Sequence, residues 1–146
     1  MQQKEFTSLP PRPKLNSSAE EAYPWYSVGS GIWEYPLNSS NSLDSPTGTT
    51  SITSGERSVI QWCEPNVQWP LDNFVITHDY IEEVIFLEGG LKDLTLQQEW
   101  GPGAYAYRLP DMKHGPYRAG ENGCLEFVKC ITRGSGSDVR ILIISC

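Results

Sequence analysis

Residues 78–93 read HDYIEEVIFLEGGLKD, and this stretch decides the fold that we expect. After His78, two carboxylates, Glu82 and Glu83, open a run of β-branched and large apolar residues that ends at the glycine pair 89–90. Runs of this length and composition are typical of β-strands, and a glycine pair is typical of a turn. The stretch therefore predicts a strand with a histidine just before it and two carboxylates at its start.

Similar runs follow one another along the second half of the chain, each of strand length and each bounded by turn residues. They lie at 58–63, 73–78, 82–88, 94–100, 103–109, 124–131 and 139–145. The turn signals lie at 89–90, 101–103, 110–111, 120–123 and 134–136. Seven or more antiparallel strands in one domain close into a sandwich or barrel, because open apolar edges aggregate. We therefore expect an all-β fold.

The first part of the chain has a different composition. Residues 1–22 are polar and rich in proline, serine and glutamate, which predicts a flexible, irregular N-terminal arm. Residues 38–55 are rich in Ser, Thr, Asn and Gly, which favour local side-chain hydrogen bonds over regular structure. They predict a long loop, or a weak edge strand with loops. At 146 residues the chain has the size of one domain, so we expect a single barrel over residues 23–146.

Composition also bounds the partners and the compartment. The net charge is −7, from 18 acidic and 11 basic residues, and it repels phosphate backbones and anionic membranes. The first residues lack the apolar core of a secretory signal, and no apolar run approaches the roughly 18 residues that cross a bilayer. We therefore expect a soluble, cytoplasmic protein that binds neither nucleic acid nor a membrane. Cys63, Cys124, Cys130 and Cys146 are expected to be free thiols in a reducing compartment.

The two histidines of the chain, His78 and His114, each lie at the end of a predicted strand. Strand ends that meet across a barrel can bring such side chains together with Glu82. Two imidazoles and one carboxylate form a site suited to Fe(II), Zn(II) or Mn(II). Three protein ligands leave coordination positions open, as a catalytic metal requires and a purely structural zinc does not.

Three stretches together resemble the cupin superfamily: residues 78–93, GPGAYAYRLPDMKHGP at 101–116 and GCLEFVKC at 123–130. The resemblance is closest to the small cupins that are similar to the C-terminal domain of zinc-binding anti-sigma factors. It covers about residues 56–132, with a weaker echo at 31–34. It implies a double-stranded β-helix, or jelly-roll barrel, with a metal site in its cup.

In that family the first motif reads His-x-His, three or four residues, Glu, six residues and Gly, and a Pro-containing turn then leads to a third His. Carried over by position, His78, Glu82 and His114 are implied as metal ligands and as catalytic residues. Glu83 stays an alternative to Glu82, because it fits the spacing counted to the second glycine. Ile76 stands where the first histidine is expected, so the four-ligand site of the family is incomplete.

Three explanations for Ile76 remain open. The ion is held by three residues and water fills the gap, or another side chain supplies a fourth ligand, with Asp79, Tyr80, Tyr105 and Tyr107 as candidates by type. Alternatively, metal binding has been lost and the same histidines and glutamate act as acid and base. The expected cofactor is a divalent metal, in the first place Fe(II), with Zn(II) or Mn(II) as alternatives.

Aromatic residues are frequent in and beside the predicted strands, and most are expected to fill the barrel and a dimer face. They are Trp62, Trp69, Trp100, Tyr105, Tyr107 and Tyr117. Aromatic walls with a few polar tips also hold flat organic ligands, which favours a carbon-rich or aromatic substrate over a sugar phosphate. Arg108, Arg118 and Lys129 are expected in solvent, but one that points into the cup would pair with an acidic or enolate oxygen of a ligand. Glu126 is a candidate for a buried acid.

The cupin fold hosts many activities, so function must come from the site. The first hypothesis is an Fe(II) dioxygenase or oxidase that acts on an enolisable or phenolic compound. The second is a non-redox cyclase, isomerase or dehydratase in which His78 and His114 donate and accept protons. The third is a non-catalytic sensor or binding module for a metal or a small ligand. A homodimer is also expected, because small cupins commonly pair through sheet edges.

Overall fold

A computed structural model describes residues 5–39 and 55–132 of the chain. Within these ranges it contains one short helix and eight strands. Their bounds are α1 Ala19–Ala22, β1 Tyr26–Gly29, β2 Ile32–Ser39, β3 Gly55–Cys63, β4 Gln68–Trp69, β5 Ile81–Asp93, β6 Gln98–Trp100, β7 Tyr105–Arg108 and β8 Tyr117–Thr132. The prediction of an all-β fold is confirmed.

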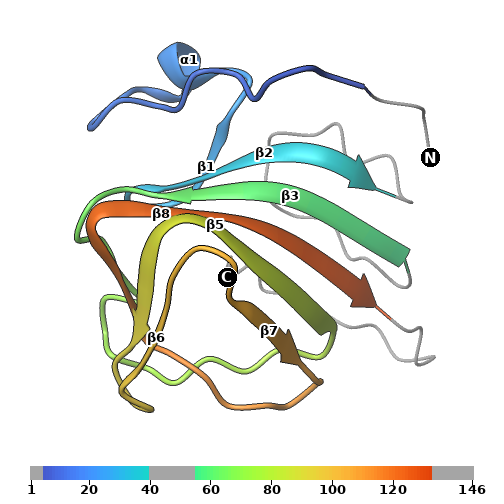
Figure 1. Cartoon of the computed structure of the whole chain (residues 1–146), viewed down its shortest axis with the longest axis vertical. Helices are drawn as coiled ribbons and strands as arrows, with labels where there is room; N and C mark the ends of the chain where they lie inside the picture. The colour runs from blue at the N-terminus through green and yellow to red at the C-terminus, as the bar shows by residue number, and fades with distance from the viewer. Residues whose placement is uncertain (1–4, 40–54, 133–146) are drawn as a thin grey trace.

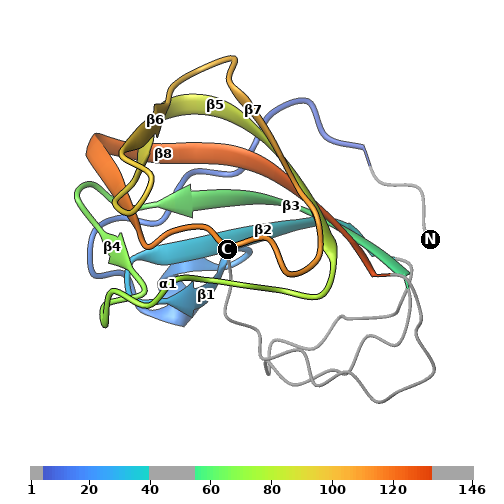
Figure 2. The ribbon, with the colours of Figure 1, turned by 90° about the horizontal axis from the view of Figure 1, so that it is seen from below.

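The strands form one antiparallel sheet that curls into a cup (Figures 1 and 2). The order along the sheet is β1-β2-β3-β8-β5-β6, while β4 pairs with β8 and β7 pairs with β5. The longest strands, β5 and β8, pair from Ile81↔Ile131 to Asp93↔Tyr117. Both strands curve along their length (Figure 1), so β8 pairs with β3 over one half and with β4 near its other end.

Two glycines make this curvature possible. Gly89 in β5 and Gly123 in β8 have φ angles of +71° and +76°, in the left-handed region that favours glycine. The register of the β5–β8 pair shifts on both sides of Gly89, as it does at β-bulges, which bend strands. The turns predicted at 89–90 and 120–123 are therefore wrong, because these glycines bend continuous strands instead of ending them.

The strand predicted at 73–78 is also wrong. Asn73 has a φ of +57°, which takes the chain out of the extended conformation. Only Ile76 makes a β-type contact, an isolated antiparallel bridge to His114. The segment is therefore a loop that is pinned to the cup at one point.

Of the strand predicted at 94–100, only Gln98–Trp100, which form β6, are a strand in the structure. The carboxylate of Asp93 accepts hydrogen bonds from the backbone N–H groups of Thr95 and Leu96, at 2.8 Å each. Such side-chain bonds stabilise a turn in place of a strand. Conversely, the echo at 31–34 belongs to an eight-residue strand, β2, because it pairs with β3 along its length. The run at 139–145 and most of the loop at 38–55 lie outside the described residues.

The two faces of the sheet bury separate apolar layers. Alternation along β3 sends Val59 and Cys63 into the cup and Ile60 and Trp62 to the outer face. The N-terminal segment covers this outer face, where the Arg12 guanidinium lies 4.8 Å from the centre of the Trp62 ring. Contacts of this kind hold the described part of the arm against the barrel. The domain boundary at residue 23 stays a prediction.

Two further expectations concern the cysteines and the absence of membrane-spanning segments. Cys63, Cys124 and Cys130 are free thiols, as predicted for the cysteines that the structure describes. Across residues 5–39 and 55–132, no helix has the length and apolar character needed to cross a membrane.

Candidate metal and active site

Strands β5 and β7 supply the first part of the site. Glu82, at the start of β5, pairs with Arg108 of β7, so their side chains share the inner face of the sheet. Glu82 is 0% exposed and Arg108 is 6% exposed. Glu83 points to the other face, where its carboxylate accepts a hydrogen bond of 2.8 Å from the hydroxyl of Tyr105. Of the two carboxylates that the sequence left open, Glu82 is the one inside the cup.

The two histidines come from loops that are tied together by their backbones. His78 lies between β4 and β5, and His114 lies between β7 and β8. The N–H of Ile76 donates to the carbonyl of His114 at 2.7 Å, and the N–H of His114 donates back at 3.1 Å. The N–H of Asp111 donates to the carbonyl of His78 at 2.8 Å. These bonds fix the two loops side by side at the cup.

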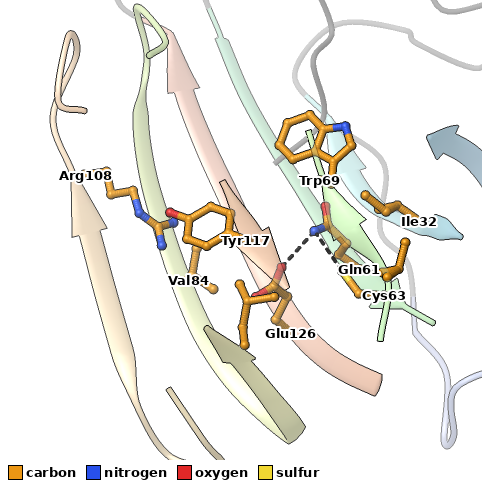
Figure 3. A pocket seen from close by; sticks show the side chains of 10 residues that line it. Ile32, Gln61, Cys63, Trp69, Val84, Arg108, Tyr117 and Glu126 are labelled. Atoms are coloured by element: carbon orange, nitrogen blue, oxygen red, sulfur yellow. Dashed lines mark hydrogen bonds between the residues drawn. The ribbon is translucent and has the colours of Figure 1, made fainter. Parts of the chain in front are cut away.

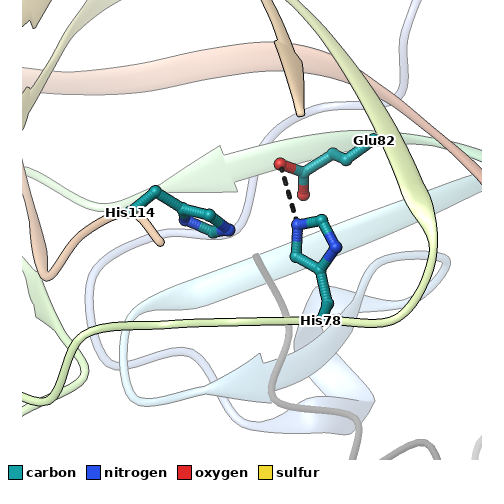
Figure 4. A group of neighbouring side chains, drawn as sticks. All are labelled: His78, Glu82 and His114. Atoms are coloured by element: carbon teal, nitrogen blue, oxygen red, sulfur yellow. Dashed lines mark ion pairs between the residues drawn. The ribbon is translucent and has the colours of Figure 1, made fainter. Parts of the chain in front are cut away.

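His78, Glu82 and His114 form one buried group (Figure 4). One ligand atom from each residue lies within 4.8 Å of the others. Nε2 of His78 is 3.8 Å from Oε2 of Glu82, and the centres of the two imidazole rings are 4.9 Å apart. The structure thus brings together the three residues that the sequence singled out.

The proton of His78 can be placed from its hydrogen bond. Nδ1 lies 2.8 Å from the backbone carbonyl oxygen of Tyr80. A carbonyl only accepts, so Nδ1 carries a proton, and a metal would bind through the lone pair of Nε2. Nε2 is buried and has no hydrogen-bond partner among the described residues. The Tyr80 ring stacks on the imidazole at 4.1 Å, so the lone pair is held in one direction.

His114 is held in a neutral form. Burial, and then the positive charge of Arg108, lowers the pKa of His114 to about 4, so the ring carries no charge at pH 7. Its Nδ1 lies 2.8 Å from the hydroxyl of Tyr117. Its Nε2 is buried without a hydrogen-bond partner in the part of the chain that is described. Next to it, the N–H of Gly115 donates to the Asp93 carboxylate at 2.7 Å, which anchors the loop.

The position of the missing family histidine is part of the apolar core. Ile76 is 7% exposed and packs with the residues that line the inside of the cup. Among the residues considered as a fourth ligand, Asp79, Tyr105 and Tyr107 are exposed, and Tyr80 stacks on the neighbouring imidazole. Side-chain donors from His, Cys, Asp and Glu therefore number three in the described site.

Arg108 is the site residue that the sequence placed wrongly, because it was expected in solvent. Its Nη1 donates to Oε2 of Glu82, forming a buried ion pair. Its guanidinium lies 5.7 Å from the centre of the Trp100 ring and 5.4 Å from that of Tyr117. The sequence signal that could have placed Arg108 is the alternation of side chains along the strand YAYR. Tyr105 and Tyr107 lie on the exposed face of this strand, so Arg108 lies on the opposite face, which points inward.

Behind Arg108 and Tyr117 the cup narrows into a small cavity (Figure 3). Its apolar wall includes Val84 and Trp69, and its polar wall includes Gln61 and Glu126. The room for water molecules is about 20 Å³, which is about enough for one. Trp69 and Tyr117 thus supply an aromatic lining, around a space that holds about one water molecule.

Glu126 is the buried acid that the sequence raised as a candidate. It is 3% exposed, and its Oε1 accepts a hydrogen bond of 2.8 Å from Nε2 of Gln61. Burial raises the pKa of Glu126 to about 8, although the positive charge of Arg108 opposes this shift. At pH 7 most of the protein therefore holds Glu126 as a neutral carboxylic acid.

This raised pKa predicts that the fold loses stability as the pH rises. Between about pH 4.5 and 8 the folded state binds more protons at Glu126 than the unfolded state does, so the free energy of unfolding falls over that window. At about 1.4 kcal/mol per pKa unit, the loss is about 5 kcal/mol at alkaline pH. We expect Glu126→Gln, which stays neutral and still accepts from Gln61, to be more stable than the wild type at pH 9 but not at pH 4.5. Urea titrations across this range measure the difference; a constant difference between the two proteins at every pH contradicts the assignment.

Comparison with known proteins identifies the fold. The sequence matches no protein-family model and no curated protein. The structure is similar to an RmlC-like cupin from Shewanella frigidimarina NCIMB 400, with a TM-score of 0.51 and 13% identity over 87% of this chain and 96% of that one. It is also similar to the polyketide cyclase RemF from Streptomyces resistomycificus, with a TM-score of 0.50 and 18% identity over 82% of this chain and 78% of that one.

A third similar structure is a chain in the complex of Rhodobacter sphaeroides SigE with the anti-sigma ChrR. The TM-score is 0.50 and the identity 16%, over 72% of this chain and 46% of that one, so the present chain spans less than half of that relative. At these identities the likeness concerns the fold. The chain has the cupin fold, a jelly-roll barrel, and it resembles the anti-sigma cupin as the sequence motifs implied.

Proposed function

We propose that this cupin-fold chain is a divalent-metal-dependent enzyme that acts on a small organic molecule, with Fe(II) as the metal and dioxygen as the co-substrate. The convergence of His78, Glu82 and His114 carries the proposal. Two imidazoles and one carboxylate with open positions are the donor set of non-haem Fe(II) oxygenases.

Three features of the residues fit such an ion. Both Nε2 atoms, of His78 and His114, are buried, and no described residue forms a hydrogen bond with them. Nδ1 of His78 donates to a carbonyl, which leaves its Nε2 for a metal, and His114 is neutral at pH 7, so the ring of His114 carries no charge that would repel a cation. Glu82 adds a carboxylate, whose negative charge the ion would share with the Arg108 guanidinium that pairs with it.

The bound ion would supply Lewis acidity and, as Fe(II), electrons for the reduction of dioxygen. The chain itself supplies orientation and exclusion of water. Stacking on Tyr80 fixes the ring of His78, and the hydroxyl of Tyr117 fixes that of His114. The side chains of His78 and Glu82 are only 5% and 0% exposed, so reacting groups here would be shielded from solvent.

The surroundings of the site support a carbon-rich substrate. The two loops that carry the histidines also expose five large apolar side chains, which are Leu71, Phe74, Val75, Leu109 and Met112. Apolar side chains grouped at the surface often mark a binding site. A sugar or a phosphate ester would gain little binding free energy from contact with these apolar side chains.

Oxygen consumption tests the proposed function. The metal-free protein is loaded with Fe(II) without oxygen, exposed to a panel of β-diketones and phenols, and followed with an oxygen electrode. We expect uptake with at least one compound in the Fe(II) form, and none in the Zn(II) form, which cannot donate electrons. Bound iron without oxygen uptake on any compound of the panel contradicts the oxygenase proposal.

A non-redox cyclase, isomerase or dehydratase is the second candidate. It is favoured by the ion pair between Glu82 and Arg108, which engages the carboxylate, and by the shared fold with the polyketide cyclase RemF. In this case His78 and His114 would move protons on the substrate. Turnover that continues in the presence of a chelator and without oxygen would favour this candidate over the first.

A further inference from the structure

A polar groove lies where the N-terminal segment meets the barrel. Residues 16–19, the hairpin of β1 and β2, and the loop between β3 and β4 line it. It has room for about 500 Å³, within the range of pockets that bind small molecules. Its polar side chains are Asn16, Ser17, Ser27, Ser30, Glu64 and Asn66. The groove shares no lining residue with the candidate metal and active site, so it is a separate feature of the fold.

Glu64 gives this groove a charge. It is the only charged residue in the lining, and it is 8% exposed. Its Oε1 accepts a hydrogen bond of 2.8 Å from Nε1 of Trp33. Its Oε2 lies beside Gly31, where a Cβ would be 3.4 Å away. No residue in the described part of the chain donates to Oε2 or forms an ion pair with this carboxylate. A largely buried charge without a counter-ion is unfavourable, so a cation in the groove would stabilise it.

We propose that the groove binds a small organic amine in its ammonium form. An ammonium group has three N–H donors, of which one reaches Oε2 of Glu64 and the others reach the serine and asparagine oxygens of the lining. A guanidinium pairs best with a carboxylate that has both oxygens free, but Trp33 already occupies Oε1. The inference goes beyond the proposed function, because it concerns a different site and a different class of ligand.

A metal ion fits this groove less well than an amine. Hard divalent cations take six or more oxygen ligands, several of them carboxylates, and the groove offers one carboxylate. Within residues 5–39 and 55–132, three donors from His, Cys, Asp and Glu come together only at His78, Glu82 and His114. The net charge of −7 attracts any cation weakly, so the test must separate contact with Glu64 from this general attraction.

A matched pair of small molecules tests the proposal. The compounds are 4-amino-1-butanol, which is an ammonium ion at pH 7, and 1,4-butanediol, which differs in that one group and is neutral. Each is titrated into the metal-free protein and followed by NMR, with the indole N–H of Trp33 as the reporter beside Glu64. We expect the amine to bind at least about tenfold more tightly, as one charge-assisted bond would give. Equal affinities, or no binding of the amine, overturn the proposal.

Two neutralising variants show whether Glu64 itself makes the contact. Glu64→Gln loses the charge but keeps an oxygen for the N–H of Trp33, and it should lose the preference for the amine. Glu20→Gln removes the same charge from an exposed residue of α1, next to the groove residue Ala19, and it should keep the preference. A preference that survives in Glu64→Gln, or that falls equally in both variants, overturns the proposal.

A third variant leaves Glu64 and Trp33 unchanged and so guards against a folding defect. Ser30→Lys places an ammonium of the protein in the groove, on the exposed turn between β1 and β2. We expect its affinity for 4-amino-1-butanol to fall several-fold, because the new side chain competes for Glu64. An unchanged affinity contradicts the proposed position of the ligand. These titrations need neither metal nor turnover, so their outcome is independent of the oxygen-uptake test of the proposed function.

Discussion

We expect His114→Ala to lose its affinity for Zn(II) by more than about 100-fold, since even residues that only support a metal ligand change affinity by about 10–100-fold. The substitution removes one of the three donors that lie within 4.8 Å of each other and leaves two. Competition with a chromophoric chelator measures the affinity. A thermal melt of the same sample checks that the barrel is folded. This control is needed because His114 is only 4% exposed, so removal of its ring leaves a buried cavity that destabilises the fold.

The adjacent carboxylates give the matched control. Glu83→Gln changes a residue on the outer face that hydrogen-bonds to Tyr105, so it should bind Zn(II) like the wild type. Glu82→Gln removes the charged donor inside the cup and should weaken binding strongly. Full affinity in His114→Ala, or a loss in Glu83→Gln that Glu82→Gln does not show, would place the metal elsewhere.

The second large effect concerns the bend of the barrel. A Cβ atom at Gly89 would lie 2.0 Å from the carbonyl oxygen of Gly123, which is backbone and cannot rotate away. The residue also has a φ of +71°, which alone costs a non-glycine residue about 1 kcal/mol or more. We expect Gly89→Ala to lower the melting temperature by about 10 °C or more, as a loss of about 3 kcal/mol would do in a domain of this size.

Gly101→Ala is the control for this prediction. No heavy atom lies within 4 Å of a Cβ built at Gly101, so the space around it is open. We expect its melting temperature to differ from that of the wild type by no more than about 2 °C. If Gly89→Ala melts at the same temperature as Gly101→Ala, β5 and β8 do not pass each other as closely as described.

The candidate site could be predicted from the sequence to the extent that it depends on spacing. The distances along the chain from His78 to Glu82 and from Glu82 to Gly89 fit a motif, and the motif implied the right partner in His114. Spacing could not choose between Glu82 and Glu83. The pairing of β5 with β7 decides this choice, because it sets which carboxylate faces inward.

The features that the sequence analysis missed depend on contacts between distant residues. Glycine pairs favour turns locally, but at Gly89 and Gly123 two long strands press their backbones together, and the glycines bend the strands there. Arg108 looks like a surface residue until its pairing with Glu82 is known, since only a buried counter-ion makes its burial tolerable. Such partners are set by the fold, and no local pattern contains them.

X-ray absorption at the zinc edge of the Zn(II)-loaded protein tests the central claim most directly, because it reports the atoms that bind the ion. We predict a first shell of nitrogen and oxygen at about 2.0–2.2 Å, with the scattering pattern of two imidazoles and no sulfur. In His114→Ala the imidazole signal should fall by half or the ion should be absent. A sulfur shell at about 2.3 Å, or an unchanged spectrum in that variant, would contradict a site built from His78, Glu82 and His114.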